Sequence, residues 1–182
     1  MLNETKKILL ATDLSEDCRN AYTHAFDIAN ACNGQIVLFH VITASPIASS
    51  LERRIDRLLG KGGFDTIMTD YASEARSVLI GKRKEIDIIR NALAKFRTAL
   101  SRFSGDAKAT PTGEPLPDDE VIVRNGDDVV EEILSVVQEK EIDMIVLSAH
   151  AKTSDEANIS KMMFQLLRLA RVPVTIVPPI RI

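Results

Sequence analysis

The chain has 182 residues, of which 45% are hydrophobic and 27% are charged. This composition is typical of a globular protein with a sizeable core and excludes an intrinsically disordered chain. The formal net charge of -3 gives no general attraction to nucleic acids or anionic membranes, and no apolar run is long enough to span a bilayer. We therefore expect a single domain over residues 1–182, with no nucleic-acid or membrane partner.

The N-terminal segment and the two cysteines indicate the cytoplasm. The first residues lack the long apolar stretch of a signal peptide. Cys18 and Cys32 fall on one face of the same predicted helix, about 20 Å apart along its axis, which is too far for a disulfide. We expect both to be reduced thiols in the core of a cytoplasmic protein. Together with His24 and His40 they form no metal-binding pattern, so we expect no metal site.

The first part of the chain has the pattern of a β-α-β unit. Residues 7–13 predict a buried strand that ends on Asp13, and residues 35–41 predict a second buried strand. Between them apolar residues recur at helical spacing, so we expect a helix with Ser15 as its N-cap and Gly34 as its left-handed C-cap. The two strands should be parallel and joined by a right-handed crossover.

The middle of the chain is helical and longer than a simple crossover requires. Residues 50–59 predict an amphipathic helix, which the glycine-rich run at 60–63 ends. That run has neither the spacing of a phosphate-binding loop nor a strand before it, so we interpret it as a hinge. A further helical pattern carries an apolar stripe, which predicts core packing or a surface for a protein partner. The stripe consists of Ile86, Ile89, Leu93, Phe96, Leu100 and Phe103. Residues 45–118 are thus interpreted as a helical insertion with an exposed loop.

The last part of the chain returns to alternating strands and helices. The expected strands are residues 120–124, 143–147 and 172–177. Asp127 or Asp128 should cap the helix between the first two, and a helix at about 160–170 should precede the last. A strand followed by a loop and a helix N-terminus is the usual place for an anion in an open α/β sheet. The loop that begins at Ser148, however, contains no glycine up to Ser160.

Several blocks of this sequence resemble the universal stress protein (UspA-like) family. They are Lys7–Ser15, Phe39–Val41, Asn125–Leu134, Asp143–Leu147 and Pro173–Val177. The resemblance implies an α/β fold of the flavodoxin- or Rossmann-like type, similar to the adenine nucleotide alpha hydrolases. It implies an open parallel five-stranded sheet of order 3-2-1-4-5 with helices on both faces. The helical insertion would then lie between strands 2 and 3, where it is longer than is usual in the family.

The resemblance also implies where a nucleotide would bind. ATP-binding members hold the adenosine with the acid and backbone that correspond to Asp13 and Val41, and hold the phosphates with a glycine-rich loop after strand 4. The glycine and hydroxyl positions of that loop are here Ser148, Ala151, Ser160 and Lys161. Side chains at these positions obstruct the approach of backbone N–H groups to phosphate oxygens. We therefore interpret the site as degenerate and expect no usual ATP binding, while binding of ATP or AMP stays open as the alternative.

Two functions of different classes follow. We favour a cytoplasmic stress-response protein that acts by association and not as an enzyme, because no acid–base or metal constellation is present in the motifs. The last strand, Val172–Val177, would lie at the sheet edge in the family order, and we expect a homodimer through it. The alternative is an adenine-nucleotide-binding sensor that uses Asp13, Val41 and the loop lysines. Asp13 could equally hold the turn at Leu14 and Ser15. A slow phosphohydrolase has the least support.

Overall fold

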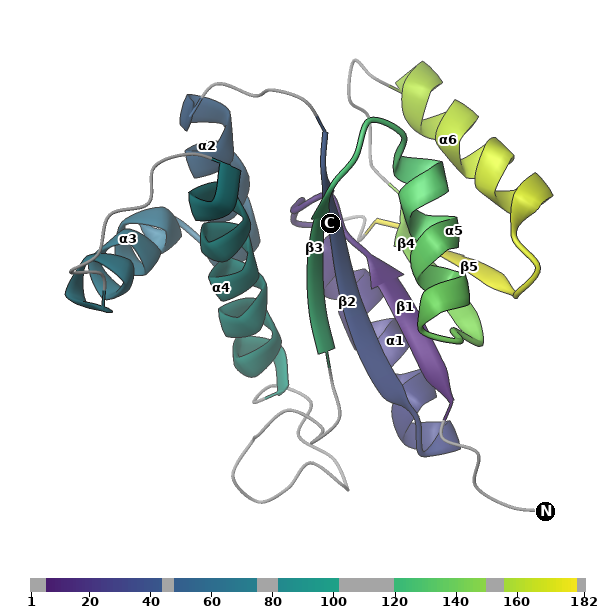
Figure 1. Cartoon of the computed structure of the whole chain (residues 1–182). Helices are drawn as coiled ribbons and strands as arrows, with labels where there is room; N and C mark the ends of the chain where they lie inside the picture. The colour runs from purple at the N-terminus through teal and green to yellow at the C-terminus, as the bar shows by residue number, and fades with distance from the viewer. Residues whose placement is uncertain (1–5, 44–47, 75–81, 102–119, 150–155, 180–182) are drawn as a thin grey trace.

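The computed structural model describes residues 6–43, 48–74, 82–101, 120–149 and 156–179 (Figure 1). In chain order the elements are β1 (Lys7–Ala11), α1 (Cys18–Cys32), β2 (Gln35–Ile42), α2 (Ala48–Leu59), α3 (Gly63–Glu74), α4 (Lys82–Ser101), β3 (Glu120–Asn125), α5 (Val129–Glu139), β4 (Met144–Ser148), α6 (Glu156–Leu169) and β5 (Val174–Val177). None of the described helices combines the length and apolar character that a bilayer crossing requires.

The strands form one parallel sheet of order β3-β2-β1-β4-β5, which confirms the predicted architecture. In its register Leu10 of β1 lies opposite both Leu38 of β2 and Val146 of β4. After β3 the chain crosses back over β2 and β1 to add β4 on the other side of β1. The carboxyl ends of β1 and β4 therefore border the crevice where open α/β sheets usually bind ligands.

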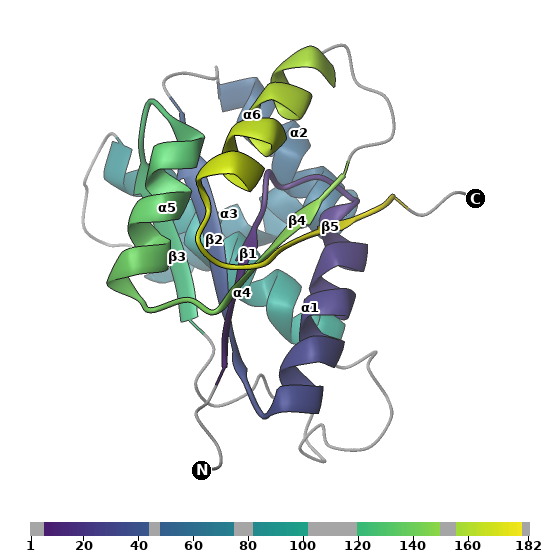
Figure 2. The same cartoon turned by 90° about the vertical axis from the view of Figure 1, so that its right-hand side faces the viewer.

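Helices cover both faces of the sheet (Figures 1 and 2). One face packs against α1 and the inserted helices, and the other packs against α5 and α6. The alternation of side chains along a strand divides β1 between these cores, since Ile8 and Leu10 face α1 while Leu9 faces α5. Strands buried on both faces in this way explain the continuous apolar runs of the sequence.

The turn from α2 to α3 depends on the predicted glycine hinge. Gly60 and Gly62 have φ values of 98° and 82°, which residues with a Cβ rarely adopt. Asp56 Oδ1 accepts a hydrogen bond of 2.9 Å from the amide of Phe64, in the first turn of α3. The hinge is thus a helix-to-helix turn and follows no strand.

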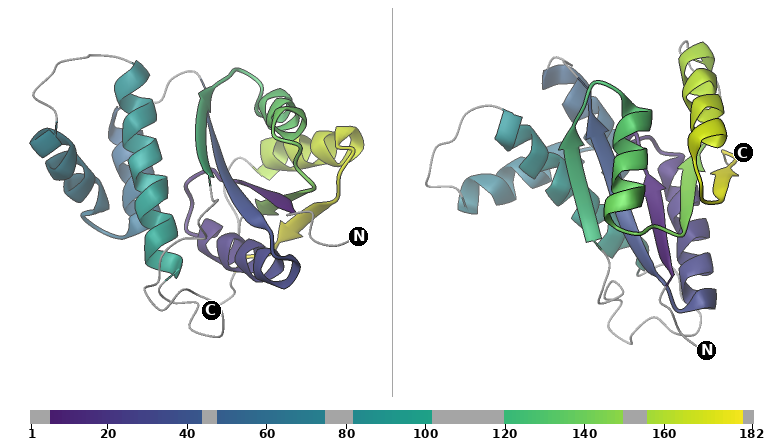
Figure 3. Two further views of the ribbon diagram at one scale, coloured as in Figure 1. Left: turned by 60° about the horizontal axis from the view of Figure 1, so that its bottom comes forward. Right: turned by 45° about the vertical axis from the view of Figure 1, so that its right-hand side comes forward.

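The inserted helix α4 confirms the core packing predicted from its stripe. Ile89, Leu93 and Phe96 are buried, and the ring of Phe96 meets that of Tyr22 on α1 edge to face at 5.7 Å. Phe103 and the side chain of Leu100 lie outside the described residues. The described part of the stripe is therefore occupied by contacts within the chain. Figure 3 shows α2, α3 and α4 grouped on one side of the molecule.

The start of α1 differs from the sequence expectation. The helix begins at Cys18, so Asp17 and not Ser15 occupies the N-cap position, and the Asp17 side chain makes no capping hydrogen bond. The amide of Ser15 is instead bonded to Asp13 Oδ1 at 3.0 Å. The prediction of Ser15 as N-cap was wrong because the side chain of Asp13 organises a tight turn before the helix begins.

The end of α1 also differs in two respects. Asn33 has a φ of 54° and takes the left-handed position that we predicted for Gly34. Gly34 is required for another reason, since a Cβ there would lie 2.4 Å from the carbonyl oxygen of Lys6. Cys32 is exposed, whereas Cys18 is buried. The prediction of Cys32 as a core thiol was wrong because Cys32 lies in the last turn of α1, beyond the helix's last buried residue, Ala29.

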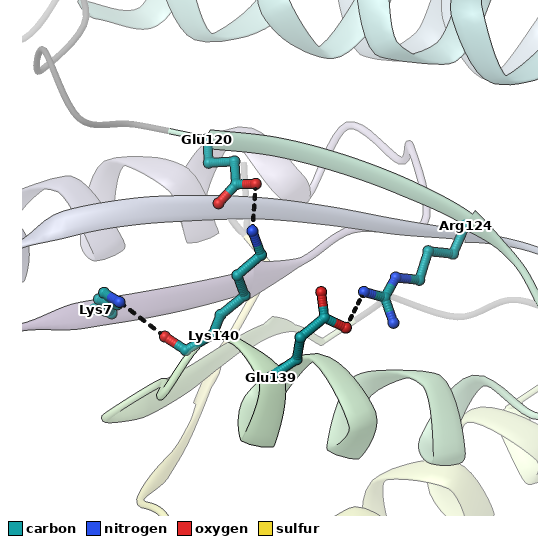
Figure 4. A network of polar contacts seen from close by, with 5 residues as sticks. All are labelled: Lys7, Glu120, Arg124, Glu139 and Lys140. Carbon is teal, nitrogen blue, oxygen red and sulfur yellow. Dashed lines mark hydrogen bonds and ion pairs between the residues drawn. The ribbon is translucent and has the colours of Figure 1, made fainter.

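A set of polar contacts aligns β3 with the end of α5 (Figure 4). Lys140 Nζ donates to Glu120 Oε1 at 2.7 Å, and Lys7 Nζ donates to the carbonyl oxygen of Lys140 at 3.0 Å. Arg124 forms an ion pair with Glu139, and this hydrogen bond and charge lower the pKa of the Glu139 carboxyl. Because the side chains are partly exposed, we assign to them the alignment of β3 and little of the stability.

The close approach at Gly34 gives a test of the fold. Gly34→Ala should lower the free energy of unfolding by roughly 1–3 kcal/mol, because the new methyl group must displace the Lys6 carbonyl. Asn33→Gly is the matched control and should change it by less than about 0.5 kcal/mol, since glycine accepts a positive φ freely. Urea unfolding measures both. A Gly34→Ala variant as stable as the parent protein would show that this packing is incorrect.

Candidate functional site

The connection from β1 to α1 is a turn held by its own side chains. Thr12 Oγ1 accepts a hydrogen bond from the amide of Leu14 at 3.0 Å, and Asp13 Oδ1 accepts one from the amide of Ser15 at 3.0 Å. Leu14 has a φ of 66°, and its side chain is fully buried, which offsets the cost of that backbone conformation. Asp13 thus fills the turn-holding role that the sequence left open beside ligand binding.

A buried thiol joins this turn to β4. Cys18 Sγ lies 2.8 Å from Thr12 Oγ1, 3.3 Å from Asp13 Oδ1 and 3.6 Å from Ser148 Oγ. Burial and the Asp13 carboxylate raise the pKa of Cys18, so the sulfur stays protonated and can donate. Ser148, a predicted site residue, therefore directs its hydroxyl toward Cys18.

The crevice between β1 and β4 is narrow and mainly apolar. Asp13 and Ser148, two of the predicted site residues, both border a cavity of about 130 Å³. Apolar side chains of α5 and α6 also line it, namely Val129, Ile133, Met162 and Met163. Small-molecule sites usually have volumes of about 300–1,000 Å³. Between the described residues, the crevice is therefore smaller than a typical ligand site.

The other predicted site residues are placed differently. Val41 is 8% exposed and packs in the core beneath α5, so its side chain contributes to that core. Lys161 is exposed on α6. Ala151 and the side chain of Ser160 lie outside the described residues. The amide of Ala149, the first residue after β4, donates to the carbonyl oxygen of Val177 at 2.8 Å and so belongs to the sheet. Within the described part of the chain, no group of three or more His, Cys, Asp or Glu side chains could hold a metal ion.

Two residues of this region were missed by the sequence analysis, His40 of β2 and Arg54 of α2. His40 is 2% exposed, and its Nδ1 donates to the carbonyl oxygen of Thr12 at 2.6 Å. Its Nε2 then accepts a hydrogen bond from Arg54 Nη2 at 3.3 Å. Arg54 Nη2 also donates to the carbonyl oxygen of Asp13 at 3.2 Å. The signal in the sequence was a histidine within a largely apolar strand.

The surroundings of His40 keep its ring neutral. Burial first, and the positive charge of Arg54 second, lower the pKa of His40 from 6.5 to about 4. A neutral ring with its proton on Nδ1 leaves Nε2 free to accept from a guanidinium. The histidine thus links the inserted helix α2 to the end of β1.

Helix α2 places arginines on the other side of the same turn. A second cavity, of about 240 Å³, lies between α2 and the β1–α1 turn. Its lining consists of Asp13, Leu14, Ser15, Arg53, Arg54 and Arg57. Arg19 of α1 donates to the carbonyl oxygen of Leu58 at 2.9 Å and 3.3 Å, which fixes the end of α2 against α1. Asp13 therefore borders an apolar crevice on one side and a basic cavity on the other.

Fold and sequence together define the class of this protein. The sequence model of the universal stress protein family matches residues 4–58 and 67–178, and the chain belongs to that family. No curated protein matches the chain in sequence.

Solved structures with the same fold include several universal stress proteins. The chain is similar to universal stress protein UspA from Lactobacillus plantarum, with a TM-score of 0.57 and 17% identity over 96% of this chain and 99% of that one. It is similar to the universal stress protein from Archaeoglobus fulgidus in complex with dAMP, with a TM-score of 0.55 and 12% identity over 97% and 98%. It is also similar to a universal stress protein in complex with cAMP, with a TM-score of 0.53 and 17% identity over 96% of this chain and 98% of that one.

The neutral state of His40 gives a pH prediction. Because the unfolded chain binds a proton near pH 6.5 and the folded chain only near pH 4, stability should fall as the pH drops through this window. The loss from this one group should be about 3 kcal/mol at pH 4, and His40→Gln should lack that part of the slope. Urea unfolding at several pH values measures the slope, and NMR titration of the His40 ring measures the pKa directly. A ring that titrates near pH 6.5 would contradict the buried Arg54 contact.

Proposed function

We propose that this protein acts in the stress response by association with a second copy of itself, and that it does so without the usual ATP binding. The observation that carries this proposal is the position of its exposed apolar side chains. The large apolar residues most exposed in the described part are Phe164, Leu167, Leu169 and Ile176. All of them lie on α6 and β5, which are consecutive along the chain.

The position of β5 at the edge of the sheet suits this part of the molecule to binding a partner. Strand β5 ends the sheet, so one of its edges carries unpaired backbone groups that can bond to another strand. Phe164 is 67% exposed and Leu167 is 52% exposed, and both project from the helix that leads into that strand. Exposed apolar side chains on α6 and on an open edge strand favour a second copy of the chain, since a symmetric contact repeats the same surface.

The crevice supports the second half of the proposal. The family resemblance places phosphates on the loop after β4, where this chain has no glycine between Ser148 and Ser160. The amide of Ala149 is bonded within the sheet, and Met162 and Met163 occupy the α6 side of the crevice. Among the described residues around the crevice, these features leave little volume for a triphosphate.

The association is tested by mass in solution. Light scattering at micromolar concentration should give twice the chain mass of 20.1 kDa. Phe164→Glu and Ile176→Glu should each weaken the dimer at least about tenfold, because each places a charge where an apolar side chain is buried on association. Asn91→Glu adds the same charge on exposed α4 and should leave the mass unchanged. A parent protein of single-chain mass, or a dimer insensitive to both α6 and β5 variants, would overturn the proposal.

A second candidate function is an adenine-nucleotide-binding sensor. The observation that favours it is that two universal stress proteins of the same fold were solved in complex with cAMP and with dAMP. In this chain Asp13 borders the crevice, and its carboxylate could accept a hydrogen bond from a ribose hydroxyl.

Calorimetry separates the two candidates. With ATP and magnesium, the association proposal predicts no binding tighter than roughly 100 μM, which corresponds to about 5–6 kcal/mol. The same limit is expected for AMP in the crevice. Tighter binding that Asp13→Ala abolishes, with Asp17→Ala as the control for loss of a nearby acid, would favour the sensor.

A further inference from the structure

We propose that the cavity between α2 and the β1–α1 turn is a binding site for a phosphate dianion, either free or as the phosphate monoester of a small molecule. This site is separate from the apolar crevice and from the surface of α6 and β5. It does not depend on the self-association proposed above.

The charges that line the cavity favour a dianion. Arg53, Arg54 and Arg57 contribute three guanidinium groups, and Asp13 contributes the one carboxylate among the described lining residues. The Asp13 carboxylate is itself engaged by the amide of Ser15 at 3.0 Å and by Cys18 Sγ at 3.3 Å. The excess of positive charge matches phosphate, whose oxygens guanidinium groups can bind in pairs.

The two acids of α2, Glu52 and Asp56, are not among the residues that line the cavity. Asp56 lies between the arginines in sequence, yet its Oδ1 accepts from the amide of Phe64 at 2.9 Å, at the start of α3. Arg53 and Arg57 are four residues apart, so they lie on one side of the helix.

The cavity is also organised by buried groups, which distinguishes it from a group of surface arginines. Arg54 is held by the neutral ring of His40 at 3.3 Å and by the carbonyl oxygen of Asp13 at 3.2 Å. His40 is 2% exposed and is fixed in turn by the carbonyl oxygen of Thr12. A guanidinium held in this way loses little further freedom when an anion binds, and such preorganisation raises affinity.

The cavity is below the usual size of a drug-sized ligand site, so it suits a ligand as small as a phosphate. Its volume of about 240 Å³ exceeds that of the crevice, and Ser15 is also among its lining residues. Because the cavity contains three arginines and only one carboxylate, binding should depend on ionic strength and on the charge of the ligand.

The test is calorimetry on the full chain with ribose 5-phosphate, inorganic phosphate, ribose and acetate as probes. Both phosphates should bind with a Kd below about 1 mM, whereas ribose and acetate should bind at least about tenfold more weakly. Tighter binding of ribose 5-phosphate would assign a monoester, and equal binding would assign free phosphate; both results support the site. No saturable phosphate binding up to about 10 mM, or acetate binding as tight as phosphate, would overturn it.

Matched variants locate the site. Arg53→Gln and Arg57→Gln should each weaken phosphate binding about tenfold, and Arg57→Lys should have a smaller effect because it keeps the charge but loses the paired donors. Arg168→Gln removes the same charge from exposed α6 and should change the Kd by less than about twofold. Equal losses for Arg57→Gln and Arg168→Gln would mean nonspecific attraction and would overturn the proposal. The mass in solution, measured on the same samples, tests self-association separately.

Discussion

The hydrogen bond from the buried His40 ring to the carbonyl oxygen of Thr12 is the contact on which this account depends. It joins β2 to the end of β1, and the other ring nitrogen accepts from Arg54 of α2. A buried ring that was charged, or that lacked either partner, would carry a large desolvation cost. The inserted helix α2 is therefore positioned over the end of the sheet by a polar contact in addition to its apolar face. Through Arg54 this contact also reaches the backbone of Asp13.

The two cavities that Asp13 borders differ in polarity. Toward α5 and α6 the sheet end is lined by apolar side chains, and Ser148 is turned to the thiol of Cys18. Toward α2 it is lined by arginines, Leu14 and Ser15. In an open α/β sheet the crevice at the strand ends is where a ligand is expected. In this chain the arginines that suit an anion lie beside that crevice, on a helix that belongs to the insertion.

The sequence was sufficient to predict the sheet and its order, because buried parallel strands give apolar runs and the resemblance supplied the topology. It also predicted the glycine hinge at 60–63 and the buried face of α4, since both are local patterns. It failed at Ser15 and Gly34, where the outcome depends on contacts with Asp13 and with the Lys6 carbonyl. The pairing of His40 with Arg54 could not be predicted, because the insertion's packing on the sheet brings these residues together and no short spacing encodes it. Of the candidate site, Asp13 and Ser148 meet at the crevice, while Val41 belongs to the core.

The central claim is that phosphate chemistry in this protein belongs to α2 and not to the loop after β4. A crystal structure of the full chain grown with AMP tests it most directly, because electron density for phosphorus locates the anion without assumptions about affinity. The phosphate should lie between Arg53 and Arg57, in the cavity beside the β1–α1 turn. A phosphate bound instead by the backbone amides of residues 148–161 would contradict it.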